Sequence, residues 1–431
     1  MRANTRQARG LPIAITLGLV ALSCNASRTP APTLAPASVT QLPTSVSLLT
    51  LTSPAATPPP PPTSYEDLYA SLSDALSEFE DHLAANWDGA RGETVFGAEL
   101  IIANGNRGDV LLQPATMAGV RLYLDRLQQI GVGGVTVQIA DPLLSPGYAR
   151  SDEYLAFYRQ VAEEARGRGL VLTVETGPVF PDPQFSRVQY DWSQLTLDEY
   201  FQIRHDDLVR IATEIGPDYL SLGNEPATEA MLTGLSFSLQ DYLAFVRETA
   251  ADVDRSQGTR IGAGTGTWED PSYLEALTAE PSLDFIGLHL YPLSNGRTDY
   301  WLRAIEAAQA AAANGRAVVV GEAWLYKASP EEVAAGMAYQ DVFGRDLYSF
   351  WQPLDSRFLT AVVGMADWLD FDYVSFFWSG LFFGYLDYDA LLSGLPAPEL
   401  YARLNQEEFA GLQAGRLTET GRAYQALLAG R

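Results

Sequence analysis

The feature that most constrains this chain is an alternation of short apolar runs with longer segments of helical periodicity. Segments between most of the runs have apolar residues at helical spacing, as in 153–169, where Leu155, Tyr158, Val161 and Ala162 would share one face. A further amphipathic helix is expected before the first run, from about 65 to 85. The eight runs are 95–103, 134–140, 170–177, 218–226, 260–268, 284–292, 317–326 and 373–380.

Continuous apolar strands that alternate with helices predict a parallel sheet covered on both faces. Eight such units over 95–380 predict an α/β chain with one (β/α)8 TIM barrel, in which 327–372 and 381–408 are long connections. The structural alternative is a doubly wound open sheet. It is disfavoured because no glycine-rich phosphate fingerprint opens a helix, and the segment GAGTGT at 262–267 is interpreted as small residues lining a barrel interior.

Acidic side chains end two of the apolar runs. Asn224 and Glu225 end the fourth run in LGNEP, and Glu322 lies near the end of the seventh in VGEAW. Residues at the carboxyl ends of barrel strands face the common mouth, where barrel enzymes keep their active sites. A carboxylate after an apolar run is costly unless it is paired, hydrogen-bonded or used in catalysis. Glu225 and Glu322 are therefore the candidate catalytic pair.

An Asn–Glu pair after the fourth strand and a Glu after the seventh resemble the signature of clan A glycoside hydrolases, which are retaining β-glycosidases on a (β/α)8 barrel. The resemblance covers about 95–380, and the sixth run is similar to that of family 53 galactanases and of some family 39 and family 5 enzymes. It implies that Glu225 is the general acid/base, that Glu322 is the nucleophile and that Asn224 holds the sugar 2-hydroxyl. The family within the clan, and with it the sugar, stays unresolved.

The same resemblance gives roles to side chains of the sixth and eighth runs. It implies that His289 lies near the acid/base, that Tyr291 hydrogen-bonds the nucleophile and that Trp378 is the platform beneath the sugar at the cleavage point. An apolar C–H face of a sugar packs well on aromatic rings. The aromatic residues suited to subsite walls are Trp192, Trp268, Trp324, Trp378, Tyr291 and Tyr326.

The chain departs from the clan after its second and third runs. Many clan members carry an Arg and a His there, whereas this chain has Gln138 with Asp141, and Glu175. Gln138 and Glu175 are therefore candidates for binding the substrate. Glu175 and Asp141 have a second interpretation, which is that they only accept hydrogen bonds from backbone amides. Glu99, after the first run, is placed only loosely by the pattern.

The expected chemistry is a double displacement. Two carboxyl groups about 5–5.5 Å apart let one attack the anomeric carbon while the other protonates the leaving oxygen. Each residue also has an ordinary structural interpretation, since NEP can be a turn and a lone His can be a buried core residue. Joint placement on the fourth, sixth, seventh and eighth runs favours a hydrolase. The alternatives are a non-catalytic carbohydrate-binding surface lipoprotein and a Ser or metal hydrolase on the same barrel, although no GxSxG segment is present.

Charge and metal-ligand content exclude other classes. The 53 acidic residues outnumber the 28 basic ones, for a formal charge of −25, which excludes a nucleic-acid binder and is compatible with a neutral carbohydrate substrate. The single cysteine and the three histidines, His82, His205 and His289, lack metal-ligand spacing. No metal or organic cofactor is expected.

The first 64 residues predict export of the protein. Arg2, Arg6 and Arg9 precede a short apolar run, so residues 1–24 are typical of a signal peptide. The segment ALSC resembles a lipoprotein box, which implies lipidation of Cys24 and a bacterial lipoprotein at the cell surface; the alternative is an ordinary secretory signal and an extracellular enzyme. Residues 25–64 are rich in Pro, Thr and Ser and predict an extended linker, followed by a catalytic domain over 65–431.

Overall fold

The structure is a computed structural model that describes residues 58–183, 185–291, 300–335, 337, 339–389 and 391–431. Each of the eight runs forms a strand, and the strands close into a parallel barrel in chain order, with β1 hydrogen-bonded to both β2 and β8. The predicted (β/α)8 barrel is thus confirmed. The predicted signal peptide, Cys24 and the linker up to residue 57 lie outside the described residues. The strands are β1 (Val95–Glu99), β2 (Gly134–Asp141), β3 (Val171–Pro178), β4 (Tyr219–Ser221), β5 (Arg260–Gly266), β6 (Phe285–Leu290), β7 (Ala317–Ala323) and β8 (Tyr373–Phe376).

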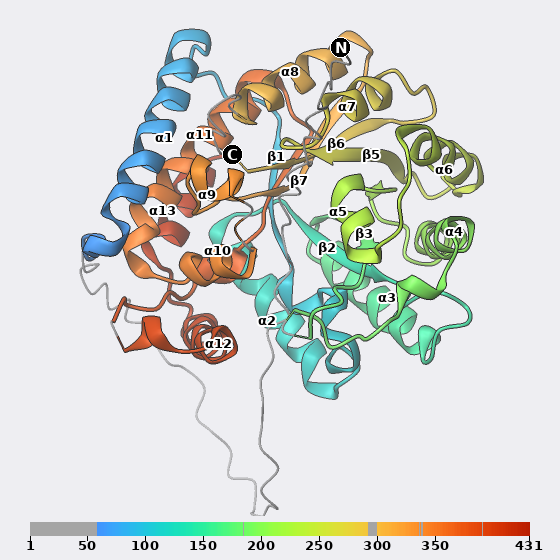
Figure 1. The fold of residues 1–431 in the computed structure, drawn as a ribbon, viewed down its shortest axis with the longest axis horizontal. Helices are drawn as coiled ribbons and strands as arrows, with labels where there is room; N and C mark the ends of the chain where they lie inside the picture. The colour runs from blue at the N-terminus through green and yellow to red at the C-terminus, as the bar shows by residue number, and fades with distance from the viewer. Residues whose placement is uncertain (1–57, 184, 292–299, 336, 338, 390) are drawn as a thin grey trace, which may run out of the picture.

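Helices surround the barrel (Figure 1). The amphipathic helix expected before the first strand is α1, and its buried residues Leu72, Leu76, Phe79 and Leu83 recur at helical spacing. It packs against α11, where Arg357 forms an ion pair with Glu80. The helices are α1 (Glu66–Asn86), α2 (Pro114–Ile130), α3 (Ser151–Gly167), α4 (Leu197–Glu214), α5 (Pro226–Thr233), α6 (Leu239–Asp252), α7 (Pro271–Thr278), α8 (Tyr300–Ala313), α9 (Pro330–Ala334), α10 (Tyr339–Asp346), α11 (Gln352–Leu369), α12 (Ala397–Ala414) and α13 (Glu419–Leu428).

Aromatic side chains fill the barrel interior near the amino ends of the strands. The ring of Tyr219 lies 5.6 Å from that of Phe285 and 6.1 Å from that of Tyr373, so side chains of β4, β6 and β8 meet there. Glycines of β5 leave room for them, because a Cβ on Gly262 would lie 2.4 Å from the Phe285 ring. The prediction that the glycines of 262–267 line the barrel interior is confirmed at this position.

The two long connections carry helices of their own. Segment 327–372 contains α9, α10 and α11, and the connection after β8 ends earlier than predicted because α12 begins at Ala397. Lys327, the only lysine of the chain, is fully buried and forms ion pairs with Asp346 and Asp355. A buried ammonium needs such partners. The two ion pairs of Lys327 therefore connect α10 and α11 to the segment that follows β7.

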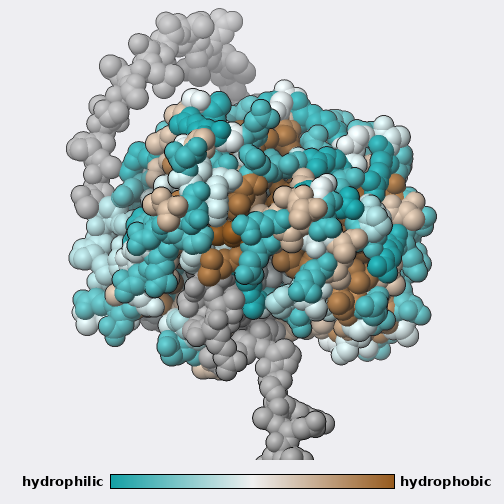
Figure 2. Space-filling model, turned by 90° about the horizontal axis from the view of Figure 1, so that it is seen from above, coloured by the Kyte–Doolittle hydropathy of each residue, from teal (hydrophilic) through white to brown (hydrophobic). Residues whose placement is uncertain are grey.

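The surface in Figure 2 is mostly hydrophilic, with hydrophobic residues in small separate areas. Among the described large hydrophobic side chains, the exposed ones are Met231, Leu391 and Phe409. Within the described part of the chain, no helix combines the length and the apolar character that crossing a membrane requires.

Candidate active site

The carboxyl ends of β4, β6 and β7 bring the two predicted catalytic glutamates to one histidine. The Nδ1 atom of His289 lies 2.6 Å from Oε1 of Glu225 and 3.6 Å from Oε2 of Glu322. The hydroxyl of Tyr291 donates to Oε2 of Glu322 at 2.8 Å. All four side chains are more than nine-tenths buried. The residues that the sequence assigned to strands four, six and seven therefore form one cluster.

A bulge in β7 brings Glu322 next to His289. Leu288 pairs with Val320, but the next residue of β6, His289, pairs with Glu322, so Gly321 is the extra residue on β7. Such an insertion turns the following side chain relative to the regular ladder. Periodicity along the seventh run does not predict this bulge, because it depends on the pairing with β6.

Glu225 lies just after the short strand β4. β4 ends at Ser221, and Glu225 is the N-cap residue of α5, whose first residue is Pro226. Proline fits this first helical position because it lacks the N–H group that would have no partner there. Asn224 is 5% exposed, and its Oδ1 accepts a hydrogen bond from the Ser221 hydroxyl.

Glu175 reaches the same histidine from β3. Its Oε1 lies 3.2 Å from Nε2 of His289, so the two ring nitrogens of His289 contact different carboxylates. Gln138 is the register partner of Glu175 on β2. A Cβ on Gly321 would lie 1.8 Å from Oε1 of Glu175, so the carboxylate of Glu175 occupies the space that a side chain at Gly321 would fill.

The charges of this cluster shift the proton affinities of its members. Burial, with the charges of Glu175 and Glu225, raises the pKa of Glu322 to about 8, although His289 and the Tyr291 hydroxyl act in the opposite direction. Burial lowers the pKa of His289, but the charges of Glu322 and Glu175 outweigh burial and raise it well above its ordinary value. The raised pKa favours the imidazolium form of His289, whose positive charge partly balances the surrounding carboxylates.

Glu99 is a further acid beside the cluster. It ends β1, is buried, and accepts a hydrogen bond from the Asn104 amide at 3.1 Å. Burial and the charge of Glu322 raise the pKa of Glu99 well above its ordinary value. The sequence signal was a charged residue inside an otherwise apolar run, but the run alone did not place Glu99 at the site.

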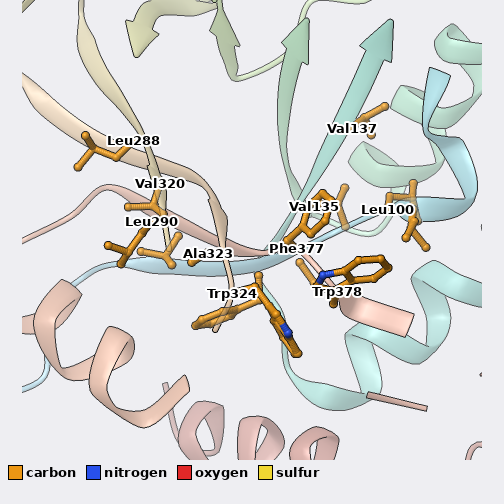
Figure 3. Packing of buried hydrophobic residues seen from close by; sticks show 14 of the residues in the cluster. Leu100, Val135, Val137, Leu288, Leu290, Val320, Ala323, Trp324, Phe377 and Trp378 are labelled. Carbon is orange, nitrogen blue, oxygen red and sulfur yellow. The ribbon is translucent and has the colours of Figure 1, made fainter. Parts of the chain in front are cut away.

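Of the predicted subsite tryptophans, Trp324 and Trp378 belong to the buried hydrophobic cluster (Figure 3). Trp378 and Trp324 are each 1% exposed. The ring of Trp378 packs against Phe377 and against Phe343 of α10, at 5.2 and 5.7 Å. The ammonium of Lys327 lies 5.5 Å from the ring of Trp324. In this structure the connection after β7 therefore covers the ring that was expected to support a sugar.

The glutamates border a small cavity of about 40 Å³. Its walls include Gln138, Asn224, Glu225, His289 and Glu322. Trp324 and Trp378 do not line this cavity. A volume of this size holds a few water molecules. Of the other predicted subsite aromatics, Trp268 is partly exposed and its ring contacts that of Tyr291 edge-on at 5.5 Å.

Glu175, His289 and Glu322 are also close enough to hold a metal ion, since one ligand atom from each lies within 4.8 Å of the others. A histidine ligand must be neutral and must offer a ring nitrogen lone pair to the metal. In this structure both ring nitrogens of His289 lie within hydrogen-bond distance of carboxylates, which opposes this. The donor set therefore fits a proton-sharing cluster better than a metal centre.

Comparisons with known proteins agree with the fold. No protein-family model matches the chain, and no curated protein sequence matches it either. Among solved structures, GH5_18 from Bifidobacterium longum subsp. longum ATCC 55813 is 17% identical, with 78% of this chain and 79% of that chain covered and a TM-score of 0.52. A variant of GH5_18 in complex with Manβ1-4GlcNAc is 17% identical over 78% of each chain, with a TM-score of 0.53. At this identity the likeness concerns the fold alone, which is a (β/α)8 barrel.

Proposed function

We propose that this chain is a retaining glycoside hydrolase of clan A that cleaves β-glycosidic bonds of an oligo- or polysaccharide with Glu225 and Glu322. One observation carries the proposal. Oε1 of Glu225 lies 2.6 Å from Nδ1 of His289, and Oε2 of Glu322 lies 3.6 Å from the same atom. These two carboxylate oxygens are therefore no further apart than the sum of the two distances, about 6 Å. Retaining enzymes separate their carboxyl groups by about 5–5.5 Å, and inverting enzymes by about 6.5–9.5 Å.

The surroundings of the two glutamates support different roles. Burial, with the charges of neighbouring carboxylates, raises the pKa of Glu322 to about 8, but the hydroxyl of Tyr291 and the charge of His289 act against this rise and stabilise the anion that a nucleophile needs. Glu225 then protonates the leaving oxygen, and afterwards takes a proton from the water that releases the sugar. The proposed double displacement requires that Glu322 is ionised and that Glu225 carries the proton when the glycosidic bond breaks.

The substrate class follows from charge. Glu175 adds a third carboxyl group beside the catalytic pair, and among the described residues of this cluster His289 is the one basic side chain. An anionic sugar would meet repulsion here, so a neutral β-glycan is the expected substrate. GH5_18 is seen with Manβ1-4GlcNAc, so β-mannosides belong in the first screen. No organic cofactor or metal takes part in the proposed mechanism.

The alternative is a carbohydrate-binding surface lipoprotein without turnover. The presence of both glutamates, each in contact with His289, favours the enzyme. A screen of nitrophenyl glycosides and neutral polysaccharides decides between them. Binding without turnover of any member would favour the alternative, and proton NMR of the first product tests the mechanism, since an inverted anomer contradicts retention.

The roles of the two glutamates can be separated with azide. We expect Glu322→Ala to lose turnover by orders of magnitude, because no covalent intermediate forms, and azide should give it an α-glycosyl azide by direct attack from the vacated side. We expect Glu225→Ala to cleave a dinitrophenyl glycoside and then stall, with azide releasing a β-glycosyl azide. Anomers of the opposite assignment, read by proton NMR, would exchange the two roles.

A further inference from the structure

A buried arginine of α4, Arg204, contacts the segment between β4 and α5 to which Glu225 belongs. Arg204 belongs to α4 and is 0% exposed. Its Nε lies 3.2 Å from Oδ2 of Asp141, and its Nη1 donates to Oε2 of Glu229. Its Nη2 donates to Oγ1 of Thr176 at 3.1 Å and to the carbonyl of Leu222 at 2.9 Å. One guanidinium thus joins the ends of β2 and β3 to the segment between β4 and α5.

The hydrogen bond from Arg204 to the Leu222 carbonyl lies just beyond the last paired residues of β3 and β4. The register of β3 with β4 is confined to two pairs, Thr173 with Tyr219 and Val174 with Leu220. Beyond these pairs, Nη2 of Arg204 bonds to both Thr176 and Leu222. The guanidinium therefore continues the connection between the two strands after their ladder of backbone hydrogen bonds has ended.

The same guanidinium holds the chain on the other side of Glu225. The N–H of Glu229 donates to the carbonyl of Glu225 at 2.8 Å, in the first turn of α5. The carboxylate of Glu229 is in turn bound by Arg204 and by the Tyr200 hydroxyl at 3.2 Å. The residues from Leu222 to Glu229 are thus held at both ends by one side chain, and Asn224 and Glu225 lie between the two points.

We propose that Arg204 is a positioning residue for Glu225: through Leu222 and Glu229 it keeps the Glu225 carboxyl in hydrogen-bond contact with His289 and at its distance from Glu322. The name acid/base for Glu225 rests on the proposed function, whereas the placement of its carboxyl does not. A residue that served stability alone would affect all substrates equally. A positioning residue affects the step that needs the proton of Glu225.

Substrates with different leaving groups distinguish a positioning role of Arg204 from a purely stabilising one. A dinitrophenyl glycoside needs no acid assistance, but a natural glycosidic bond does. Arg204→Lys keeps the charge but cannot bridge Leu222, Thr176 and Glu229 at once. In the full-length chain it should lower kcat/KM for the natural linkage by about 10²-fold, the lower range of an acid's contribution. The kcat/KM value for the dinitrophenyl glycoside should change little. Arg204→Met should enlarge the difference if it folds.

Lys327→Met is the matched control. Lys327 is also 0% exposed and also paired with two carboxylates, but on the side of β7. It should lower the midpoint of unfolding, as Arg204→Lys does, and leave the ratio of the two kcat/KM values unchanged. An unchanged ratio in Arg204→Lys would overturn the proposal.

A second measurement does not depend on turnover. The chain has three histidines, so its ¹⁵N-histidine NMR spectrum is simple, and His289→Gln assigns the imidazole proton shared with Glu225. This resonance should shift or vanish in Arg204→Lys and persist in Lys327→Met. If the wild-type enzyme hydrolyses no glycoside, the proposed function fails but the resonance still tests Arg204, and a resonance that is the same in both variants overturns the positioning role.

Discussion

Gly321 affects the positions of two carboxylates of the site, Glu175 and Glu322. It is the extra residue of the β7 bulge, and the carboxylate of Glu175 stands where its Cβ would be. Close approach of this kind requires glycine. The lack of a side chain at Gly321 therefore lets Glu175 reach His289, and the bulge at the same residue brings Glu322 to the same ring.

Gly321→Ala should lower both activity and stability. A methyl group here must displace Glu175, which removes an acceptor from His289, and overpacking of this kind costs about 1–3 kcal/mol of unfolding free energy. We expect turnover to fall by at least about tenfold, equivalent to about 1.4 kcal/mol of barrier, while the protein still folds. Gly147→Ala is the control, since nothing lies within 4 Å of its Cβ. Equal kinetics in the two variants would contradict this account.

Chelation tests whether the cluster works through protons or a metal. Because His289 is hydrogen-bonded at both ring nitrogens, we expect dialysis against a chelator to leave turnover unchanged. The measurement is the specific activity before and after dialysis. Activity that disappears and returns with a divalent ion would assign Glu175, His289 and Glu322 to a metal site.

The limits of sequence prediction at this scale have physical causes. Glu225, His289, Tyr291 and Glu322 could be predicted as neighbours because strand ends in a closed barrel share one mouth. The burial of Trp378 could not, because it depends on how a long connection folds back over β8.

At the scale of elements, α12 carries a buried acid that makes stability depend on pH. Glu408 is 6% exposed, and burial raises its pKa to about 8. Its carboxyl lies over the backbone of η6 (Ser379–Phe382), since a Cβ on Gly380 would be 2.4 Å from its Oε1. The folded protein thus holds this proton more tightly than the unfolded chain, where the ordinary value near 4.5 applies.

Glu408→Gln should stabilise the protein at alkaline pH. Between pH 4.5 and about 8 the folded state binds more protons than the unfolded state, so unfolding free energy falls as pH rises, by up to about 1.4 kcal/mol per pH unit for this group. Glutamine removes this loss. Urea unfolding at pH 5 and pH 8 measures the difference, and Glu407→Gln, at the exposed neighbour, is the control. A gap between variant and wild type that stays constant with pH would contradict the expected titration.

The elements themselves were largely predictable. Six of the eight strands lie within the apolar runs, and β2 and β3 each extend one residue beyond theirs, because a parallel strand covered on both faces is apolar along most of its length. The fourth strand is shorter than its run, since Pro226 starts α5 and the preceding residues leave the sheet. The Arg204 cluster was not predicted, because an arginine in a helical pattern ordinarily faces solvent.

At the scale of the whole molecule, the proposed export and anchoring concern residues before the described domain. Cys24 follows a signal-like segment, and the linker after it is rich in proline and uncharged from 29 to 64. Such a spacer would hold the barrel away from a membrane to which Cys24 is attached. We propose a lipid-anchored enzyme at the cell surface, with plain secretion as the alternative.

Cys24→Ser separates these two possibilities. In a host that processes lipoproteins, the wild-type protein should appear in the membrane fraction and the variant in the soluble fraction, both with the same specific activity. Fractionation and immunoblotting measure the distribution. Equal membrane association of both proteins would remove the lipid anchor and leave a secreted enzyme.

The rings of Tyr219, Phe285 and Tyr373 pack together inside the barrel at the amino ends of the strands. A substrate of the proposed enzyme would therefore enter and leave at the carboxyl ends. In the proposed mechanism, the leaving half of the substrate must then depart by the same side from which water reaches Glu225.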